Sequence, residues 1–256
     1  MRAIILAAGM GTRLRPITLT TPKSLIEVAG TSLIERQIEF LRAKGIEDII
    51  VVTGYLAEKF DFLKDQYGVT LIHNAQYESY NNFYTMYLVR HYLSDAYVID
   101  ADNFLVDNFL LSAPESSLYF GVAKEGFKDE WVLHYQQDDL RVTAITVESG
   151  QGRILSGVSY WSAEDGQHLQ QLIEGYYQEA DYANLYWDDV VKDNLADLDV
   201  HVYPIEGHQT FVTMVDGLTI YSSGKNAVWV NGGILYQITG SANLSNEQIQ
   251  KIATSL

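Results

Sequence analysis

Cysteine is missing from this sequence of 256 residues. Its absence excludes disulfides, thiolate metal sites and thiol catalysis. No run of about 18 apolar residues occurs, so no membrane-spanning helix is predicted. The N-terminus also lacks the long apolar region and the cleavage site of a signal peptide. We therefore expect a cytoplasmic protein with no membrane partner.

Basic residues are few: 17 lysines and arginines stand against 33 aspartates and glutamates, and the formal net charge is -16. A nucleic-acid partner requires a basic surface, so none is expected. The acidic surface mainly favours solubility, and it would also attract a cationic substrate group or Mg²⁺.

The first 26 residues are different, because they contain no acidic side chain and carry Arg2, Arg13, Arg15 and Lys23. In an otherwise acidic chain, such a basic island favours a local anionic ligand over an extended polyanion.

A loop with two glycines lies inside this basic segment. The apolar run 3–6 is typical of a buried strand, and it leads directly to Gly9 and Gly11. Glycine permits backbone angles closed to other residues and lets the main chain approach a ligand, and successive N–H groups of such a loop can bind a phosphate. The loop is neither a dinucleotide fingerprint nor a P-loop. Taken alone, it fits an ordinary turn equally well.

The wider motif is more specific. The run Leu6-Ala7-Ala8-Gly9-Met10-Gly11-Thr12-Arg13-Leu14, followed by Pro16 and by Pro22-Lys23-Ser24-Leu25, resembles the signature of nucleotidyltransferases that join a nucleoside triphosphate to a phosphorylated small molecule. Further segments resemble the bacterial CTP:phosphocholine cytidylyltransferases, and the similarity covers about residues 1–206. These segments are Asn81-Asn82-Phe83-Tyr84, Glu130-Trp131, residues 152–159 and Leu185-Tyr186-Trp187-Asp188.

Strand and helix patterns alternate through the first hundred residues. A capping box from Ser32 to Glu35 predicts the start of a helix, which Gly45 ends. Strands are expected at 49–52, 69–72 and 97–99, with helices between them. This order is typical of a three-layer α/β/α doubly wound fold with a mixed, mostly parallel sheet. The resemblance implies the same fold, that of the nucleotide-diphospho-sugar transferases.

The second half has shorter patterns. Four strands, at about 117–122, 131–135, 141–147 and 154–160, predict an antiparallel or mixed extension of the sheet. Two helices, at about 163–179 and 187–196, and a strand at 200–205 follow. We expect a nucleotidyltransferase domain over residues 1–216 and a turn-rich extension over 217–256. That extension either covers the acceptor pocket or contacts another subunit, and the oligomeric state is not predicted.

Two aspartates, Asp100 and Asp102, follow the strand at 97–99 and therefore share a sheet edge with the glycine loop. Mg²⁺ binds carboxylate and phosphate oxygens, and one or two protein carboxylates usually suffice. If the sequence had no glycine loop, these aspartates would be interpreted as residues that only cap a turn. The resemblance implies that Asp102 holds a catalytic Mg²⁺ and that a second carboxylate assists. Asp216 is the first candidate for that ligand, and Asp188 is its rival.

The resemblance also assigns the nucleotide site. It implies that Arg13 and Lys23 grip the triphosphate and that, with Asp102, they form the catalytic set. Asn82, or its neighbour Asn81, is a candidate for reading the base, although helix capping explains both. The expected nucleotide-binding residues are Leu6, Ala7, Ala8, Gly9, Gly11, Thr12, Arg13, Lys23, Asn82 and Asp100.

Aromatic residues are plentiful, with 18 tyrosines and 4 tryptophans. A quaternary ammonium has no N–H to donate, so its binding sites use aromatic faces with carboxylates nearby. We expect Trp131, Tyr186 and Trp187 to line a choline site, and Trp161 to belong to the core.

Together these features predict an enzyme that transfers the cytidylyl group of CTP to phosphocholine with Mg²⁺ and releases pyrophosphate. The choice of CTP rests on the resemblance. One alternative is a nucleotidyltransferase for a sugar phosphate or an aminoethyl compound. The other is a non-catalytic sensor that binds nucleotide on the same fold.

Overall fold

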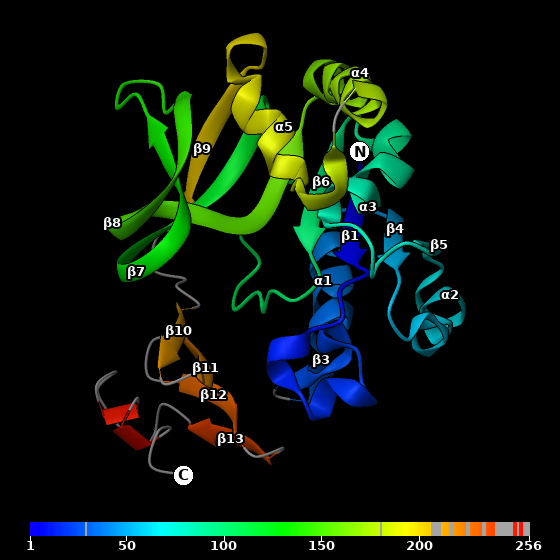
Figure 1. Ribbon diagram of the computed structural model, residues 1–256, viewed down its shortest axis with the longest axis vertical. Helices are drawn as coiled ribbons and strands as arrows, with labels where there is room; N and C mark the ends of the chain where they lie inside the picture. Colours follow the sequence, from blue (N-terminus) through cyan, green and yellow to red (C-terminus); the bar gives the residue numbers. More distant parts are fainter. Residues whose placement is uncertain are drawn as a thin grey trace.

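A seven-stranded mixed sheet in the order β5-β4-β1-β6-β8-β7-β9 forms the centre of the molecule (Figure 1). It is seen in a computed structural model that describes residues 1–28, 30–179, 181–205, 211–215, 218–223, 226–231, 234–238, 248–249 and 251–252. Its strands are β1 (Arg2–Ala7), β4 (Asp48–Thr53), β5 (Thr70–His73), β6 (Ala96–Asp100), β7 (Ser117–Tyr135), β8 (Val142–Trp161) and β9 (Val200–Ile205). β8 runs antiparallel to both of its neighbours, and the other pairs are parallel. The expected mixed, mostly parallel sheet is confirmed.

Helices cover both faces of this sheet. They are α1 (Leu33–Arg42), α2 (Phe62–Tyr67), α3 (Asn82–Val89), α4 (Ala163–Glu179) and α5 (Trp187–Asp193). Successive residues of a strand point to opposite faces. Ile5 accordingly packs with Ile34 of α1 in one buried cluster, and Ile4 packs with Phe83 of α3 in the other. The second cluster also contains residues of α4 and α5, so the three-layer arrangement is confirmed.

The first helix begins where the sequence predicts. Ser32 Oγ accepts a hydrogen bond of 3.3 Å from the Glu35 backbone N–H and donates one of 2.6 Å to the Glu35 carboxylate. These bonds satisfy polar groups that the first turn of a helix would otherwise leave unpaired. Beyond Arg42 the chain turns at Gly45, whose φ is 81°.

The four short strands predicted in the second half are wrong in number, because β7 and β8 are continuous over 19 and 20 residues. Their register shifts at several places, including between Phe127 and Glu130. β-bulges bend a strand and change its register without ending it. Gly126 and Gly150 lie in this ribbon with positive φ, at the positions where the sequence analysis interrupted the strands.

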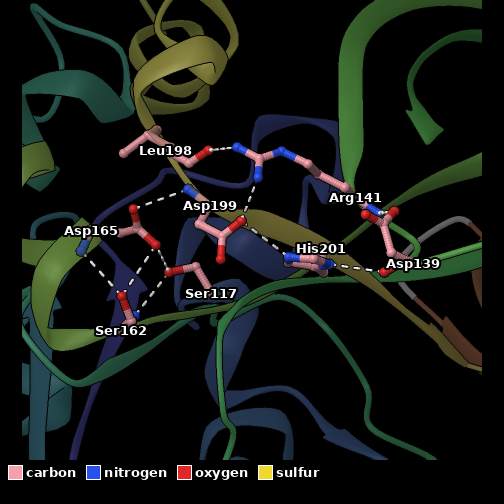
Figure 2. Close-up of polar contacts among 8 residues, drawn as sticks. All are labelled: Ser117, Asp139, Arg141, Ser162, Asp165, Leu198, Asp199 and His201. Atoms are coloured by element: carbon pink, nitrogen blue, oxygen red, sulfur yellow. Dashed lines mark hydrogen bonds and ion pairs between the residues drawn. The ribbon is translucent and has the colours of Figure 1, made fainter. Parts of the chain in front are cut away.

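A buried carboxylate ties α4 to this ribbon and to β9 (Figure 2). Asp165 is 6% exposed and accepts hydrogen bonds from the hydroxyls of Ser117 and Ser162. Its other oxygen accepts from the Asp199 backbone N–H, and Arg141 binds the Asp199 carboxylate at 2.8 Å.

The C-terminal part contains a separate antiparallel sheet. Its strands are β10 (Phe211–Val215), β11 (Leu218–Ser223), β12 (Asn226–Asn231) and β13 (Ile234–Ile238). This sheet begins before the boundary expected at residue 216, and Asp216 itself lies outside the described residues. Among the helices that are described, none combines the length and apolar character needed to cross a bilayer.

Candidate nucleotide and metal site

The glycine loop, which contains Gly9 and Gly11, and the acidic turn, which contains Asp100 and Asp102, leave the same edge of the sheet. β1 and β6 are adjacent and parallel, with Leu6 opposite Asp100, and the Ala101 N–H donates to the Leu6 carbonyl at 3.1 Å. From β1 the chain moves outward through β4 and β5, then returns to place β6 on the other side of β1. Ligands of doubly wound sheets bind at such a switch point, beyond the carboxyl ends of the strands.

Gly11 shapes the loop after β1. Its φ of 58° lies in the left-handed region, which disfavours residues with a side chain. A Cβ there would lie 3.1 Å from Lys23 Cβ and 3.1 Å from Thr18 Cγ2, and Thr18 Oγ1 donates to the Gly11 carbonyl at 2.9 Å. A Cβ on Gly9 would meet nothing within 4 Å among the described atoms. Gly11 thus allows the close approach of Lys23, whereas Gly9 borders open space.

Lys23 joins the basic segment directly to the acidic turn. Its Nζ lies 2.6 Å from Asp102 Oδ2, and the two side chains are 23% and 47% exposed. The backbone of Pro22 is extended, with a ψ of 142°, and Lys23 starts a short 3-10 helix directly after it. The structure therefore brings the predicted phosphate-binding lysine and the predicted metal-binding aspartate into contact.

Three carboxylates gather around this contact. Burial raises the pKa of Asp100 well above its ordinary value. The nearby carboxylates of Asp102 and Asp188 raise this pKa further, whereas the Lys23 ammonium lowers it. Burial also raises the pKa of Asp188 to about 7, although the Tyr119 hydroxyl, which donates to Asp188 Oδ1 at 2.8 Å, opposes that rise. This excess of negative charge is suited to a bound cation.

The carboxylates near Asp100 fit an Mg²⁺ ion that also binds oxygens of a substrate. In the part of the chain that the structure describes, no three histidine or carboxylate side chains form a ready metal site. Mg²⁺ does not require one, because one or two carboxylates and substrate phosphates commonly hold it. Asp102 and Asp188, which both lie close enough to Asp100 to raise its pKa, are the carboxylates that would offer such oxygens.

The remaining nucleotide candidates differ in exposure. Ala7 and Ala8 are buried, Leu6 is half-buried, and Thr12 and Arg13 are exposed. These residues place the backbone of the loop at the sheet edge and the Arg13 side chain in solvent.

The two asparagines are engaged in holding the fold. Asn82 Oδ1 accepts from the Trp187 backbone N–H at 2.9 Å, and Asn81 Nδ2 donates to the Asn184 carbonyl at 3.0 Å. These bonds join the start of α3 to the first residue of α5 and to the segment before it. They are not the expected helix cap, because the side chain of Asn81, the N-cap residue of α3, makes no capping hydrogen bond. Base reading by Asn82 stays a prediction.

Two of the three predicted choline residues lie together. The rings of Trp131 and Tyr186 meet edge to face with centroids 6.1 Å apart, and Tyr186 is 46% exposed. Trp187 is only 3% exposed, and its ring packs against Trp161 at 5.8 Å. The aromatic pair that reaches the surface is therefore Tyr186, which is exposed, and Trp131, which is partly buried, whereas Trp187 lies in the core.

Two residues that contact the acidic turn were not predicted from the sequence. Gln37 of α1 is fully buried and hydrogen-bonds the turn, and Gly157 of β8 packs against it. The available signal for Gln37 was a glutamine on the same helical face as Ile34, Ile38 and Leu41.

Comparison with known proteins agrees with this geometry. A family model described as Nucleotidyl transferase matches residues 2–113. The chain is 51% identical over 211 residues to a choline-phosphate cytidylyltransferase of Streptococcus pneumoniae, covering 82% of this chain and 92% of that protein. It is 37% identical over 211 residues to a 2-aminoethylphosphonate cytidylyltransferase of Lancefieldella rimae, covering 81% and 85% of the two chains.

A solved structure supports the same family assignment. The CTP:phosphocholine cytidylyltransferase from Streptococcus pneumoniae matches with a TM-score of 0.79 and 50% identity, over 81% of this chain and 91% of that one. The fold that carries the glycine loop and the acidic turn is thus shared with that enzyme over most of both chains. The chain belongs to the choline-phosphate cytidylyltransferases of the nucleotidyl transferase family.

Proposed function

We propose that this chain transfers the cytidylyl group of CTP to phosphocholine, giving CDP-choline and pyrophosphate. The observation that carries the proposal is the 2.6 Å contact between Lys23 and Asp102, beside the glycine loop, in a chain 51% identical to a choline-phosphate cytidylyltransferase. It joins a phosphate-binding group to a metal-binding group at the edge of the sheet where nucleotides bind.

We propose further that Asp102 and Asp188 hold Mg²⁺. The support is their common proximity to Asp100 and the unbalanced negative charge there. Bound Mg²⁺ would neutralise charge on the phosphates and orient them. Asp188 is the second ligand that we favour, because its charge acts on Asp100 beside Asp102; the other candidate, Asp216, lies outside the described residues.

The chain's own groups bind and orient the reactants. An oxygen of phosphocholine forms a bond to the α-phosphorus of CTP while the bond from that phosphorus to pyrophosphate breaks. The attacking oxygen is already ionised at neutral pH, so no general base is needed. The N–H groups of the glycine loop, Arg13 and Lys23 would stabilise the charge that spreads over the phosphates.

Trp131 and Tyr186 would bind the trimethylammonium group of the acceptor. Each contact of a cation with an aromatic face contributes about 0.5 to 2 kcal/mol. A primary ammonium would instead favour acceptors for its N–H groups. The pair of Trp131 and Tyr186 therefore supports phosphocholine over 2-aminoethylphosphonate, the acceptor named for the relative that is 37% identical.

An assay of pyrophosphate release tests the proposal. CTP, UTP, GTP and ATP are each combined with phosphocholine, 2-aminoethylphosphonate and a sugar 1-phosphate, in Mg²⁺ and in EDTA. We expect the highest kcat/KM for CTP with phosphocholine and no turnover in EDTA. A higher value for another acceptor would assign that substrate instead, and binding of CTP without pyrophosphate release under any condition would favour a sensor.

We also propose residues 1–216 as the catalytic domain and the cytoplasm as its location. The relatives match 81% to 82% of the chain, which supports a catalytic unit shorter than the whole sequence. Activity of a variant that ends at residue 216 tests this division.

A further inference from the structure

Gln37 is a buried polar residue on the face of α1 that packs on the sheet. Its side chain is 0% exposed. Its Nε2 donates to the backbone carbonyls of Asp100, at 3.1 Å, and of Asn103, at 2.8 Å. An amide nitrogen has two N–H groups, so both are used on this one segment.

These bonds span both ends of the turn that carries Asp102. The Asn103 backbone N–H donates to the Asp100 carbonyl at 3.1 Å, which closes the turn, and Ala101 is fixed to β1 through Leu6. Gln37 therefore anchors the carbonyls on both sides of Asp102, whose own carboxylate contacts Lys23.

Close packing against β8 also restricts the position of this turn. A Cβ at Gly157 would lie 2.2 Å from Asn103 Nδ2 and 2.7 Å from Asp100 Oδ2. Gly157 has a φ of 75°, so a side chain there would be strained as well as crowded. The turn is thus held between a hydrogen-bonding glutamine on one element and a close-packed glycine on another.

From this juxtaposition we propose that Gln37 is a positioning residue for the metal site: it fixes the Asp100–Asn103 turn and so presents the Asp102 carboxylate to Mg²⁺. This inference rests on the proposed function for its metal. Without Gln37, the Asn103 carbonyl loses this donor and the Asp100 carbonyl keeps only the bond from the Asn103 N–H, so the turn is held less tightly. Residues that orient metal ligands typically change metal affinity by about 10- to 100-fold when they are removed.

The test replaces only the donor. Gln37→Met keeps the length of the side chain, and among the described residues Gln37 Oε1 has no hydrogen-bond partner to lose. The control is Ser117→Ala, which removes a buried donor to Asp165 in the network of Figure 2, away from the acidic turn. Because it loses a buried hydrogen bond of the same kind, it matches Gln37→Met for a general loss of stability.

Mn²⁺ serves as the probe, and its binding is measured by electron paramagnetic resonance with CTP present and phosphocholine absent, so that no turnover is needed. We expect Gln37→Met to weaken Mn²⁺ binding about 10-fold or more, and Ser117→Ala to leave it unchanged. In an Asp102→Asn background, Gln37→Met should have little further effect, because its target is already removed. Mn²⁺ affinity equal to that of the unsubstituted protein, in a folded Gln37→Met variant, overturns the proposal.

Gln37→Asn covers the case in which Gln37→Met does not fold. The amide is retained but is one methylene too short to reach both carbonyls, so a smaller loss of Mn²⁺ affinity is expected, and no loss overturns the proposal. The proposed function is judged separately, by pyrophosphate release from the unsubstituted protein. A Gln37-dependent Mn²⁺ site in a protein that releases no pyrophosphate would refute the enzyme while supporting the positioning role.

Discussion

Asp188→Asn should stabilise the metal-free protein while inactivating it. Burial raises the pKa of Asp188 to about 7 from an ordinary value of 3.8. The folded protein therefore retains a proton that the unfolded chain releases, and at high pH it must hold a desolvated charge. Asparagine removes this charge, and its amide oxygen can still accept the hydrogen bond from Tyr119.

The magnitude follows from the pKa difference. A shift of about three units at about 1.4 kcal/mol each gives an upper limit of about 4 kcal/mol. Water and neighbouring groups rearrange around the charge, so we expect a gain of about 2 to 4 kcal/mol in the free energy of unfolding. The size of this gain in the free energy of unfolding depends on pH. Because the folded pKa is raised, the protein with aspartate loses stability relative to the variant as pH rises from about 4 to about 7, and the difference is constant above that.

Urea unfolding in EDTA at pH 5 and pH 8 measures this difference. The gain at pH 5 should be less than half of the gain at pH 8, because pH 5 lies between the unfolded and the folded pKa of Asp188, and Mg²⁺ with CTP should stabilise the unsubstituted protein but not the variant. Asp193→Asn is a suitable control, because this carboxylate on the same helix is 49% exposed. A gain that is the same at both pH values would show that the charge of Asp188 is not its cause.

Three further substitutions test the remaining groups. Asp102→Ala should abolish pyrophosphate release while the circular dichroism spectrum is retained, and substantial activity in Mg²⁺ would refute its role as a metal ligand. Lys23→Met should reduce kcat and also increase Mn²⁺ affinity in the absence of nucleotide, because the ammonium 2.6 Å from Asp102 competes with the metal; unchanged Mn²⁺ affinity would argue against that competition. Trp131→Ala should raise the KM for phosphocholine about 2- to 30-fold, as expected for one lost cation–π contact, with the KM for CTP unchanged. An equal rise in both values would indicate general damage rather than a choline site.

The sequence by itself determined the features that depend on neighbours along the chain. Ser32 and Glu35 are three residues apart, so their capping box is visible before any fold is known. The glycine loop and the turn with Asp102 each follow an apolar strand directly. Parallel strands bring their carboxyl ends to one edge, so the sequence predicts that the glycine loop and the acidic turn lie at the same edge; the contact between Lys23 and Asp102 was found only in the tertiary structure.

The tertiary structure decided which distant side chains share a site. Local patterns do not distinguish a bulge from a turn, so β7 and β8 were divided into four strands. The sequence analysis assigned Trp131 and Trp187 to the same choline site. Only Trp131 lies in the pair with Tyr186 that reaches the surface, because burial depends on packing across elements. Gln37 reaches the acidic turn across more than 60 residues of chain. Such contacts depend on how helices pack on the sheet, and no spacing within a single segment encodes them.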